Sequence, residues 1–309
     1  MQGIWPILYA YFDASDRLDR DAMRRQVEAA LRCGAPGVAV LGLATEVNKL
    51  SFDEKRCVVE WAAADLRGAA PLALTLSGAT VEEQIELARI GLEAQAGWFI
   101  LQPPAGAKPA EAELAHFFGR VLARLAELAP QVPVGIQNAP EFLGVGLGPE
   151  RLAALRREHA NLKFLKGEAP AVVIERTVQR LGQGFPVLNG RGGLELIDNL
   201  RAGCAGMIVA PDCAWEQQRV AELLAAGRDN EAERLYAEIL PGIVFVMQSL
   251  EALTVYGKRI AAWRSGFEVL LDRRCPLEPT PFGLKTARRF AEALGPLPGC
   301  AMTPVLREN

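Results

Sequence analysis

Histidine is scarce in this chain, with only His116 and His159 among 309 residues. A catalytic zinc site usually draws on two or three imidazoles, and a Ser-His-Asp triad needs one beside its serine. Both kinds of site are therefore poorly supplied, and we expect no metal. The six cysteines are scattered and form no CxxC pair. In a chain of this length that pattern is typical of reduced thiols in a cytoplasmic protein.

Long apolar runs and an excess of one charge are also absent. The net charge is −3, which gives no basic surface of the kind that binds nucleic acid or a membrane. No apolar stretch reaches the roughly 18 residues that span a bilayer. The opening MQGIWPILYAYFD lacks the basic segment and apolar run of a signal peptide. We expect a cytoplasmic protein that acts on a small molecule, with no nucleic acid and no membrane as partner.

Lysine accounts for only seven of the 34 lysines and arginines. Because arginine stays protonated and cannot act as a nucleophile, a retained lysine is informative. Lys166 closes the apolar run NLKFLK (161–166) and is followed by Gly167. A lysine at the end of a buried strand is costly unless it is solvated, paired or used. From these residues alone, a catalytic amine and a solvated strand end are equally open.

Eight short apolar runs alternate with helix-periodic segments. Such alternation indicates an α/β protein, a (β/α)8 TIM barrel over residues 1–225. The remainder, 226–309, is helix-periodic and indicates a C-terminal helical region packed on the barrel. A doubly wound sheet would need a Gly-rich phosphate loop, for which RGGLEL (191–196) is too weak. The strands are expected near residues 4–10, 37–42, 71–76, 97–102, 132–137, 161–166, 185–190 and 205–210.

Three helices are expected with particular clarity. Apolar residues recur at helical spacing in segments 20–32, 80–95 and 148–159. The second of these opens with Thr80 and Glu83, the spacing of a capping box. These segments fill the connections that a barrel requires between its parallel strands.

In such barrels the active site lies at the C-terminal ends of the strands. Lys166 stands at the C-terminal end of its expected strand, whereas Lys163 lies near the start. Apolar surroundings favour the neutral amine, which is the form that attacks a ketone. After the second strand, Gly42 and its successors supply backbone N–H groups and the Thr45 hydroxyl, which together suit a carboxylate. Thr45 is equally suited to capping the turn.

Several motifs, in order, are similar to those of one family. GLATEVNKLS (42–51) aligns without gaps on GTTGE-x-x-x-LS, IQNAP (136–140) on YNxP, and FLKGEA (164–169) on the IK(E/D) strand that carries a Schiff-base lysine. The opening WPILYAYFD and the later PTPFGLKTA also match. The chain resembles, over nearly its whole length, the dihydrodipicolinate synthase / N-acetylneuraminate lyase family of class I aldolases.

This resemblance implies a TIM barrel with a C-terminal helical region that assembles as a homotetramer or dimer. It implies that Lys166 forms a Schiff base with a pyruvate-type 2-oxo acid, leading to aldol cleavage, condensation or dehydration. No metal or organic cofactor is implied. The residues placed at the substrate by the aligned motifs and strand ends are Gly42, Ala44, Thr45, Gln137 and Gly190.

Departures from the family pattern concern proton transfer. The two hydroxyl residues after the glycine are replaced by Leu43 and Ala44. The tyrosine of YNxP, which moves protons at the substrate, is replaced by Gln137, and an amide cannot exchange protons in that way. The arginine that binds a second carboxylate in the diaminopimelate-pathway branch falls on Phe142. We therefore do not expect ordinary dihydrodipicolinate synthase activity.

Two residues are candidates to replace the missing phenol. Tyr11, at the end of the first strand, is ranked ahead of Glu168, which shares the side of Lys166 if its strand continues that far. Glu46 is interpreted as a structural partner of the nearby backbone or of Lys49. Two other interpretations stay open: a catalytically weak family member that binds a 2-oxo acid without efficient turnover, and a barrel of unrelated chemistry in which Lys166 is structural.

Overall fold

A computed structural model describes residues 1–182 and 184–304 of the chain. Eight parallel strands form one sheet in the order β1-β8-β7-β6-β5-β4-β3-β2. A bridge between Ile7 and Ala39 brings the two edges of the sheet together, so the barrel is nearly closed. The strands are Gly3–Pro6 (β1), Val38–Val40 (β2), Leu72–Leu76 (β3), Trp98–Leu101 (β4), Val134–Asn138 (β5), Leu162–Gly167 (β6), Val187–Asn189 (β7) and Gly206–Val209 (β8).

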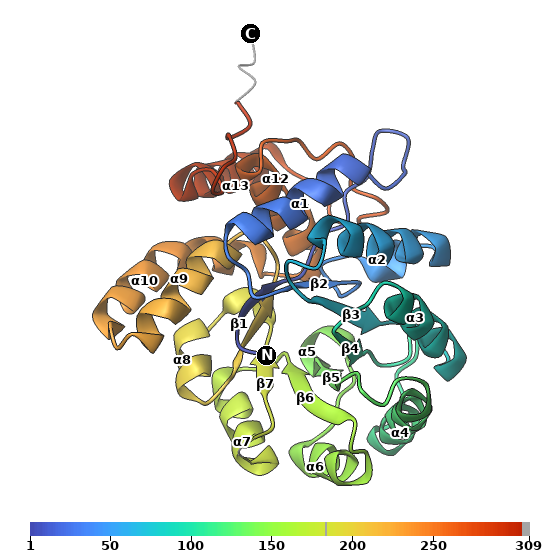
Figure 1. Cartoon of the computed structure of the whole chain (residues 1–309). Helices are drawn as coiled ribbons and strands as arrows, with labels where there is room; N and C mark the ends of the chain where they lie inside the picture. Colours follow the sequence, from blue (N-terminus) through green and yellow to red (C-terminus); the bar gives the residue numbers. More distant parts are fainter. Residues whose placement is uncertain (183, 305–309) are drawn as a thin grey trace.

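The expected TIM barrel is thus confirmed, and helices surround its strands (Figure 1). The helices that follow β1 to β8 are α1 (Arg20–Arg32), α2 (Phe52–Leu66), α3 (Val81–Glu93), α4 (Glu111–Leu128), α5 (Pro140–Leu143), α6 (Pro149–Glu158), α7 (Ala171–Leu181), α8 (Leu196–Arg201) and α9 (Ala214–Ala225). Two 3-10 turns lie at the ends of β2 and β7, at Val47–Lys49 and Arg191–Gly193.

The three helices expected with clarity are confirmed, one with a change at its start. Thr80 caps α3 as predicted, because its hydroxyl accepts the N–H of Glu83 at 3.1 Å. The other half of the predicted capping box, a hydrogen bond from the Thr80 N–H to the Glu83 side chain, is not formed. The Glu83 carboxylate accepts the N–H of Ala79 at 2.6 Å, one residue earlier than the box requires.

Aromatic rings fill the part of the barrel interior that lies toward the N-terminal ends of the strands. Trp5 of β1 meets Trp98 of β4 edge to face at 4.5 Å between ring centres. Trp98 in turn meets Phe164 of β6 at 4.8 Å. Gly135 on β5 makes room, since a Cβ there would lie 2.2 Å from the Phe164 ring. These three rings, which we call the aromatic floor, leave the next layer toward the C-terminal strand ends to other side chains.

The C-terminal region is helical, as expected. It comprises α10 (Asp229–Val246), α11 (Leu250–Ala252), a π-helical turn (Leu253–Gly257), α12 (Lys258–Arg264) and α13 (Pro281–Leu294). Helix α12 lies beside α1 (Figure 1), where Arg25 of α1 donates to the Gly266 carbonyl just after α12. Helix α13 packs on α12. Arg264, almost fully buried, pairs with Glu216 of α9 at 2.5 Å and donates to the Asp212 carbonyl at 2.6 Å. The boundary at residue 225 stays a prediction.

No single helix in the described part of the chain is long and apolar enough to cross a membrane. One sharply bent pair, Asp229–Val246 with Leu250–Arg264, reaches the threshold when its members are taken together, by length and composition alone.

Candidate active site

Lys166 lies at the C-terminal end of β6, above the aromatic floor. Along β6 only Lys163 is exposed, and Lys166 is buried, with 3% of its side chain exposed. In the sheet Lys166 stands beside Gln137 of β5 and Leu188 of β7. The solvated-strand-end interpretation therefore fits Lys163 and does not fit Lys166. An amine this buried must be paired or used.

The partner of Lys166 is the carboxylate of Glu168. The Lys166 Nζ lies 2.8 Å from Glu168 Oε1. The same oxygen accepts a hydrogen bond from Gln137 Nε2 at 2.6 Å. The Glu168 N–H donates to the Asn138 carbonyl at 3.0 Å, which continues the β5–β6 pairing beyond the end of β6. Because the chain stays extended, Glu168 points to the same side as Lys166.

A line of amides holds this carboxylate in place. Gln102, just after β4, donates through Nε2 to Gln137 Oε1 at 2.9 Å. The carbonyl of Gln102 accepts from Gln84 Nε2 of α3, also at 2.9 Å. Since the Gln137 oxygen faces Gln102, its amino group must face Glu168. All four of the side chains from Gln84 to Glu168 are buried, so water does not compete for these contacts.

Gly190, expected at the substrate, lies directly against Glu168. A Cβ at Gly190 would lie 2.9 Å from Glu168 Cγ and 3.2 Å from its Oε1. The neighbouring Asn189 fixes the two loops, because its Nδ2 donates to the Ala169 carbonyl at 2.9 Å. The glycine therefore provides the space that the Glu168 side chain occupies.

A cavity opens onto Lys166 and Glu168, and the empty space around it, open solvent included, is about 360 Å³. Its wall is mainly apolar, and among its described lining residues Arg191 is the only cation besides Lys166. Arg191 pairs with Glu195 at 2.7 Å and with Glu141 at 3.2 Å. The remaining lining residues are Ile7, Leu43, Ala44, Phe142, Gly192, Ile208, Val209, Ala210, Met247, Leu250 and Leu253.

The loop after β2 contributes Ala44 to this cavity, but Thr45 is used elsewhere. The Thr45 hydroxyl donates to the Leu8 carbonyl at 2.6 Å, and its N–H donates to the Gly42 carbonyl at 3.1 Å. Thr45 thus ties the loop to the segment that follows β1. In the described part of the chain, the N–H groups of Leu43 and Ala44 have no hydrogen-bond acceptor.

Gly42 has a packing role in this loop. A Cβ there would lie 2.2 Å from Ile7 Cδ1, so a side chain at position 42 would displace the tip of Ile7. Of the residues expected at the substrate, Gln137 and Gly190 meet at Glu168 and Ala44 faces the cavity. Gly42 and Thr45 do not line the cavity and instead pack the loop against the segment at the end of β1.

Tyr11 is placed away from Lys166. Its hydroxyl donates to the Lys258 carbonyl at 3.0 Å, and its ring meets Phe267 edge to face at 4.9 Å. Tyr11 is not among the residues that line the Lys166 cavity. Burial, with the nearby Asp212 charge, holds the pKa of Tyr11 well above its usual value. The structure therefore does not bring together Tyr11 and Lys166, and it favours Glu168 as the acid/base candidate.

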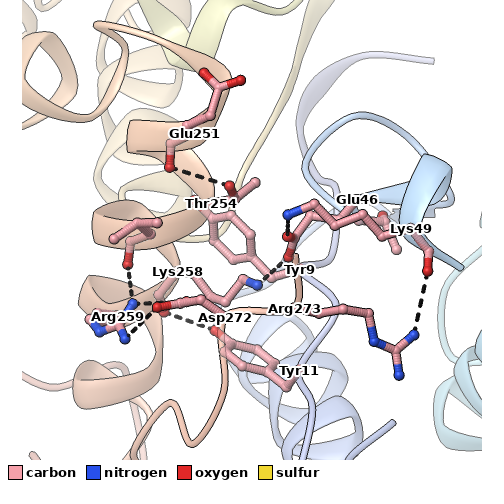
Figure 2. A network of polar contacts seen from close by, with 12 residues as sticks. Tyr9, Tyr11, Glu46, Lys49, Glu251, Thr254, Lys258, Arg259, Asp272 and Arg273 are labelled. Atoms are coloured by element: carbon pink, nitrogen blue, oxygen red, sulfur yellow. Dashed lines mark hydrogen bonds and ion pairs between the residues drawn. The ribbon is translucent and has the colours of Figure 1, made fainter. Parts of the chain in front are cut away.

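A second buried lysine, Lys258 of α12, lies beside Tyr11 (Figure 2). Its side chain is fully buried and forms an ion pair with Glu46. Glu46 also pairs with Lys49 at 2.6 Å, in line with its predicted structural role. Burial lowers the pKa of Lys258, and the Glu46 charge opposes that shift. The sequence offered one signal for this residue, a lysine retained within the apolar segment TVYGKRIAAW.

Arg191 was also missed from the sequence. It begins three successive residues with left-handed backbone, at φ 53° for Arg191, 62° for Gly192 and 89° for Gly193. The pair of glycines in LNGRGG was the available signal, because glycine adopts this conformation without a steric cost. The turn packs tightly, since a Cβ at Gly192 would lie 2.4 Å from Met247 Sδ.

Within the described residues, no three His, Cys, Asp or Glu side chains gather closely enough to hold a metal ion. The expectation that the chain needs no metal or cofactor stays a prediction.

Comparisons with known proteins agree with this geometry. The model of the Dihydrodipicolinate synthetase family matches residues 1–280. A 4-hydroxy-tetrahydrodipicolinate synthase of Thermus thermophilus is 29% identical over 287 residues, 91% of this chain and 93% of that protein.

Two solved structures show the same fold. The dihydrodipicolinate synthase from Aquifex aeolicus has a TM-score of 0.86 at 22% identity, covering 96% of this chain and 99% of that one. YagE from Escherichia coli K12, solved in complex with pyruvate, has a TM-score of 0.85 at 19% identity, covering 95% and 98%.

Proposed function

Because this chain belongs to the dihydrodipicolinate synthetase family of class I, Schiff-base lyases, we propose that Lys166 forms an imine with a pyruvate-type 2-oxo acid. The observation that carries the proposal is the buried Lys166 amine, which opens onto a cavity at the C-terminal end of β6. Active sites of TIM barrels lie at this end of the strands. The reaction class is aldol cleavage, aldol condensation or dehydration.

The chemistry follows from a neutral amine beside a ketone. The Lys166 nitrogen attacks C2 of the 2-oxo acid, and the oxygen of the resulting carbinolamine leaves as water. The iminium then accepts the electron pair released when a bond at C3 breaks. That bond is C3–C4 in aldol cleavage and C3–H in dehydration, where the C4 hydroxyl leaves afterwards. Two N–H groups without an acceptor, those of Leu43 and Ala44, are suited to the substrate carboxylate.

The apolar residues of the cavity wall favour a substrate in which the part beyond the 2-oxo acid group is apolar or aromatic. Leu43, Phe142, Met247 and Leu250 face the space next to Lys166. A heavily hydroxylated sugar acid would leave its hydroxyl groups without partners against such a wall, at a cost for each buried polar group. With Gln137 in the place of the family tyrosine, ordinary dihydrodipicolinate synthase activity is not proposed.

A second candidate function is binding of a small 2-oxo acid without efficient turnover. It is favoured by one observation, the loss of both the tyrosine and the two hydroxyl residues at aligned positions 137, 43 and 44. The two functions share the Lys166 imine and differ only in the steps after it.

We propose that the protein works in the cytoplasm as a homotetramer or dimer. All six cysteines are free thiols in the structure, as a reducing compartment would keep them. Size-exclusion chromatography with light scattering measures the assembly directly, and a monomer at micromolar concentration would contradict that part of the proposal.

Borohydride trapping tests the imine. The protein is incubated with pyruvate, or with a panel of aryl and alkyl 4-hydroxy-2-oxo acids, and reduced, and the modified residue is identified by peptide mass spectrometry. We expect an adduct on Lys166 and its loss in Lys166→Arg, which keeps the charge but not the nucleophile. Lys163→Arg, at the exposed start of the same strand, is the matched control and should be trapped like the wild type.

The outcomes separate the candidates. An adduct on Lys166 together with turnover of any panel member supports the lyase. An adduct with no turnover supports the binding protein. Folded wild-type protein that yields no adduct with pyruvate or any panel member contradicts both.

A further inference from the structure

The two oxygens of the Glu168 carboxylate have different surroundings. Oε1 receives both the Lys166 ammonium and the Gln137 amide. In the part of the chain that the structure describes, no group donates a hydrogen bond to Oε2, and Glu168 belongs to the cavity wall. One oxygen therefore anchors the side chain, and the other is open to a ligand bound at Lys166.

The spacing between lysine and acid explains why this carboxylate reaches the cavity. In the IK(E/D) pattern the acid directly follows the lysine, and alternation along a strand turns it to the opposite side. Here Gly167 follows the lysine and the acid comes one residue later, so Glu168 lies on the side of Lys166. The hydrogen bond from the Glu168 N–H to Asn138 shows that the extended backbone continues this far.

The residue at the aligned tyrosine position now serves this carboxylate. Gln137 cannot exchange protons, but its amino group is held toward Glu168 by Gln102 on the other side. Glycine at position 190 leaves the space that the carboxylate needs. Three separate strand ends thus place one ionisable oxygen next to the reacting amine.

We propose that Glu168 is the catalytic acid/base of this site, in place of the missing phenol, with Gln137 as its positioning residue. This inference rests on the proposed function of Lys166. Glu168 first takes a proton from the Lys166 ammonium, which frees the amine to attack C2. Glu168 returns this proton to the carbinolamine hydroxyl, which leaves as water and gives the iminium. The carboxylate, deprotonated again, then takes a proton from C3. The C3–H electron pair becomes the C2–C3 double bond of the enamine, and the iminium π pair moves to nitrogen. Return of a proton from Glu168 to C3 reverses the step.

Exchange of the pyruvate methyl protons in D2O tests this step without knowledge of the true substrate. Proton NMR follows the loss of the methyl signal as C3 is deprotonated and then deuterated. We expect wild-type protein to catalyse the exchange and Glu168→Gln to slow it by about 10²-fold or more, the usual contribution of a general acid/base. The amide keeps an oxygen for Lys166 and Gln137, so borohydride trapping on Lys166 should persist.

Further variants separate catalysis from positioning and from folding. Glu168→Asp should recover part of the exchange rate, and Gln137→Met should slow exchange while keeping its dependence on pH. Glu175→Gln, on the exposed surface of α7, is the matched control and should match the wild type. Thermal unfolding followed by circular dichroism verifies that each variant is folded.

Two results would overturn the inference while leaving the proposed function intact. One is a folded Glu168→Gln protein that is trapped on Lys166 and exchanges at the wild-type rate. The other is loss of exchange in Tyr11→Phe but not in Glu168→Gln. Failure of wild-type protein to form any adduct would instead remove the proposed function itself.

Discussion

Gly190 sets the space available to the Glu168 carboxylate. The Glu168 Cγ lies where a side chain at position 190 would begin, and both Lys166 and Gln137 hold the carboxylate in that position. The close approach of Glu168 leaves no room for a side chain at position 190. Position 190 therefore reports on the geometry of the site.

We predict that Gly190→Ala lowers activity. The new methyl group would push Glu168 away from Lys166, and a displacement near 1 Å can cost on the order of 10²-fold in rate. Methyl exchange of pyruvate in D2O and the thermal midpoint are measured on the same samples.

Gly119→Ala, within α4 and away from the cavity, is the matched control. Equal exchange rates for Gly190→Ala and wild type would show that Glu168 does not need its present position.

Residue roles were predictable from the sequence where local pattern decides them. Strand alternation, with the family motifs, placed Lys166 at the strand end and Lys163 outside. The hydroxyls of Tyr11 and Thr45 donate to carbonyls that local pattern does not place beside them. Tyr11 reaches Lys258, 247 residues later, and Thr45 reaches Leu8, 37 residues earlier. Such long-range partners decide whether a hydroxyl is free for a ligand.

The helical segment from Leu250 to Arg264, made of α11, the π-helical turn and α12, connects the C-terminal region to the end of the barrel where Lys166 lies. It carries a π-helical turn at Leu253–Gly257, and a Cβ at Gly257 would lie 2.6 Å from the Tyr9 hydroxyl. Directly after this turn, Lys258 reaches Glu46 in the loop that follows β2. The ion pair ties α12 to the same loop that brings Ala44 to the cavity.

We predict that Lys258→Met lowers the free energy of unfolding by about 3 kcal/mol, the lower end of the range for breaking a buried ion pair. Glu46 would lose one of its two cations and keep Lys49, which limits the cost. Urea denaturation measures the change.

The double variant Glu46→Gln/Lys258→Met removes both buried charges and should regain much of the loss. If the double variant is less stable than Lys258→Met by the full cost of a second broken pair, the two side chains do not act as a pair.

The main helices and strands were predictable because each has a local signal in the sequence. The end of β1 and the π-helical turn were not. Residues 20–32 match α1 end to end, since Asp19 caps its first turn. The expected first strand, 4–10, was too long. β1 ends at Pro6, after which Ile7 and Leu8 turn to pair with Ala39 and close the barrel. The π-helical turn has no sequence signature of its own, because it accommodates Tyr9 from the segment after β1, far away in the sequence.

At the scale of the whole molecule, the barrel and the extension share one core. Side chains of the C-terminal helices, Val255, Ile260 and Ala287, belong to the same apolar cluster as the strands. The barrel was predictable from the alternation of strands and helices. The boundary at residue 225 was drawn where that alternation stops, and alternation carries no information on how helices pack against each other.

The pH dependence of global stability should carry a contribution from Asp212, buried between the end of β8 and α9. Burial raises the pKa of Asp212 to about 6, against 3.8 in an open chain, although Tyr9 donates to it at 2.9 Å. Between those values the folded state binds a proton that the unfolded state has released. The contribution of Asp212 therefore falls as pH rises from about 4 to about 6 and is constant above that.

We predict that Asp212→Asn is more stable than wild type above pH 6, by at most roughly 3 kcal/mol, because the amide still accepts from Tyr9 and carries no charge to bury. The difference should vanish near pH 4. Thermal midpoints of both proteins between pH 4 and pH 8 provide the measurement. A constant difference across that range would exclude titration of Asp212 as its source.

The aromatic floor has an optical consequence. Trp5 and Trp98 belong to β1 and β4, which are not neighbours in the sheet, and their rings meet only across the barrel interior. Two indoles held edge to face at 4.5 Å couple electronically. Their signal in near-ultraviolet circular dichroism should therefore appear during refolding only when the sheet has curled on itself. The Trp5–Trp98 pair therefore reports when the barrel closes during refolding, without an added label.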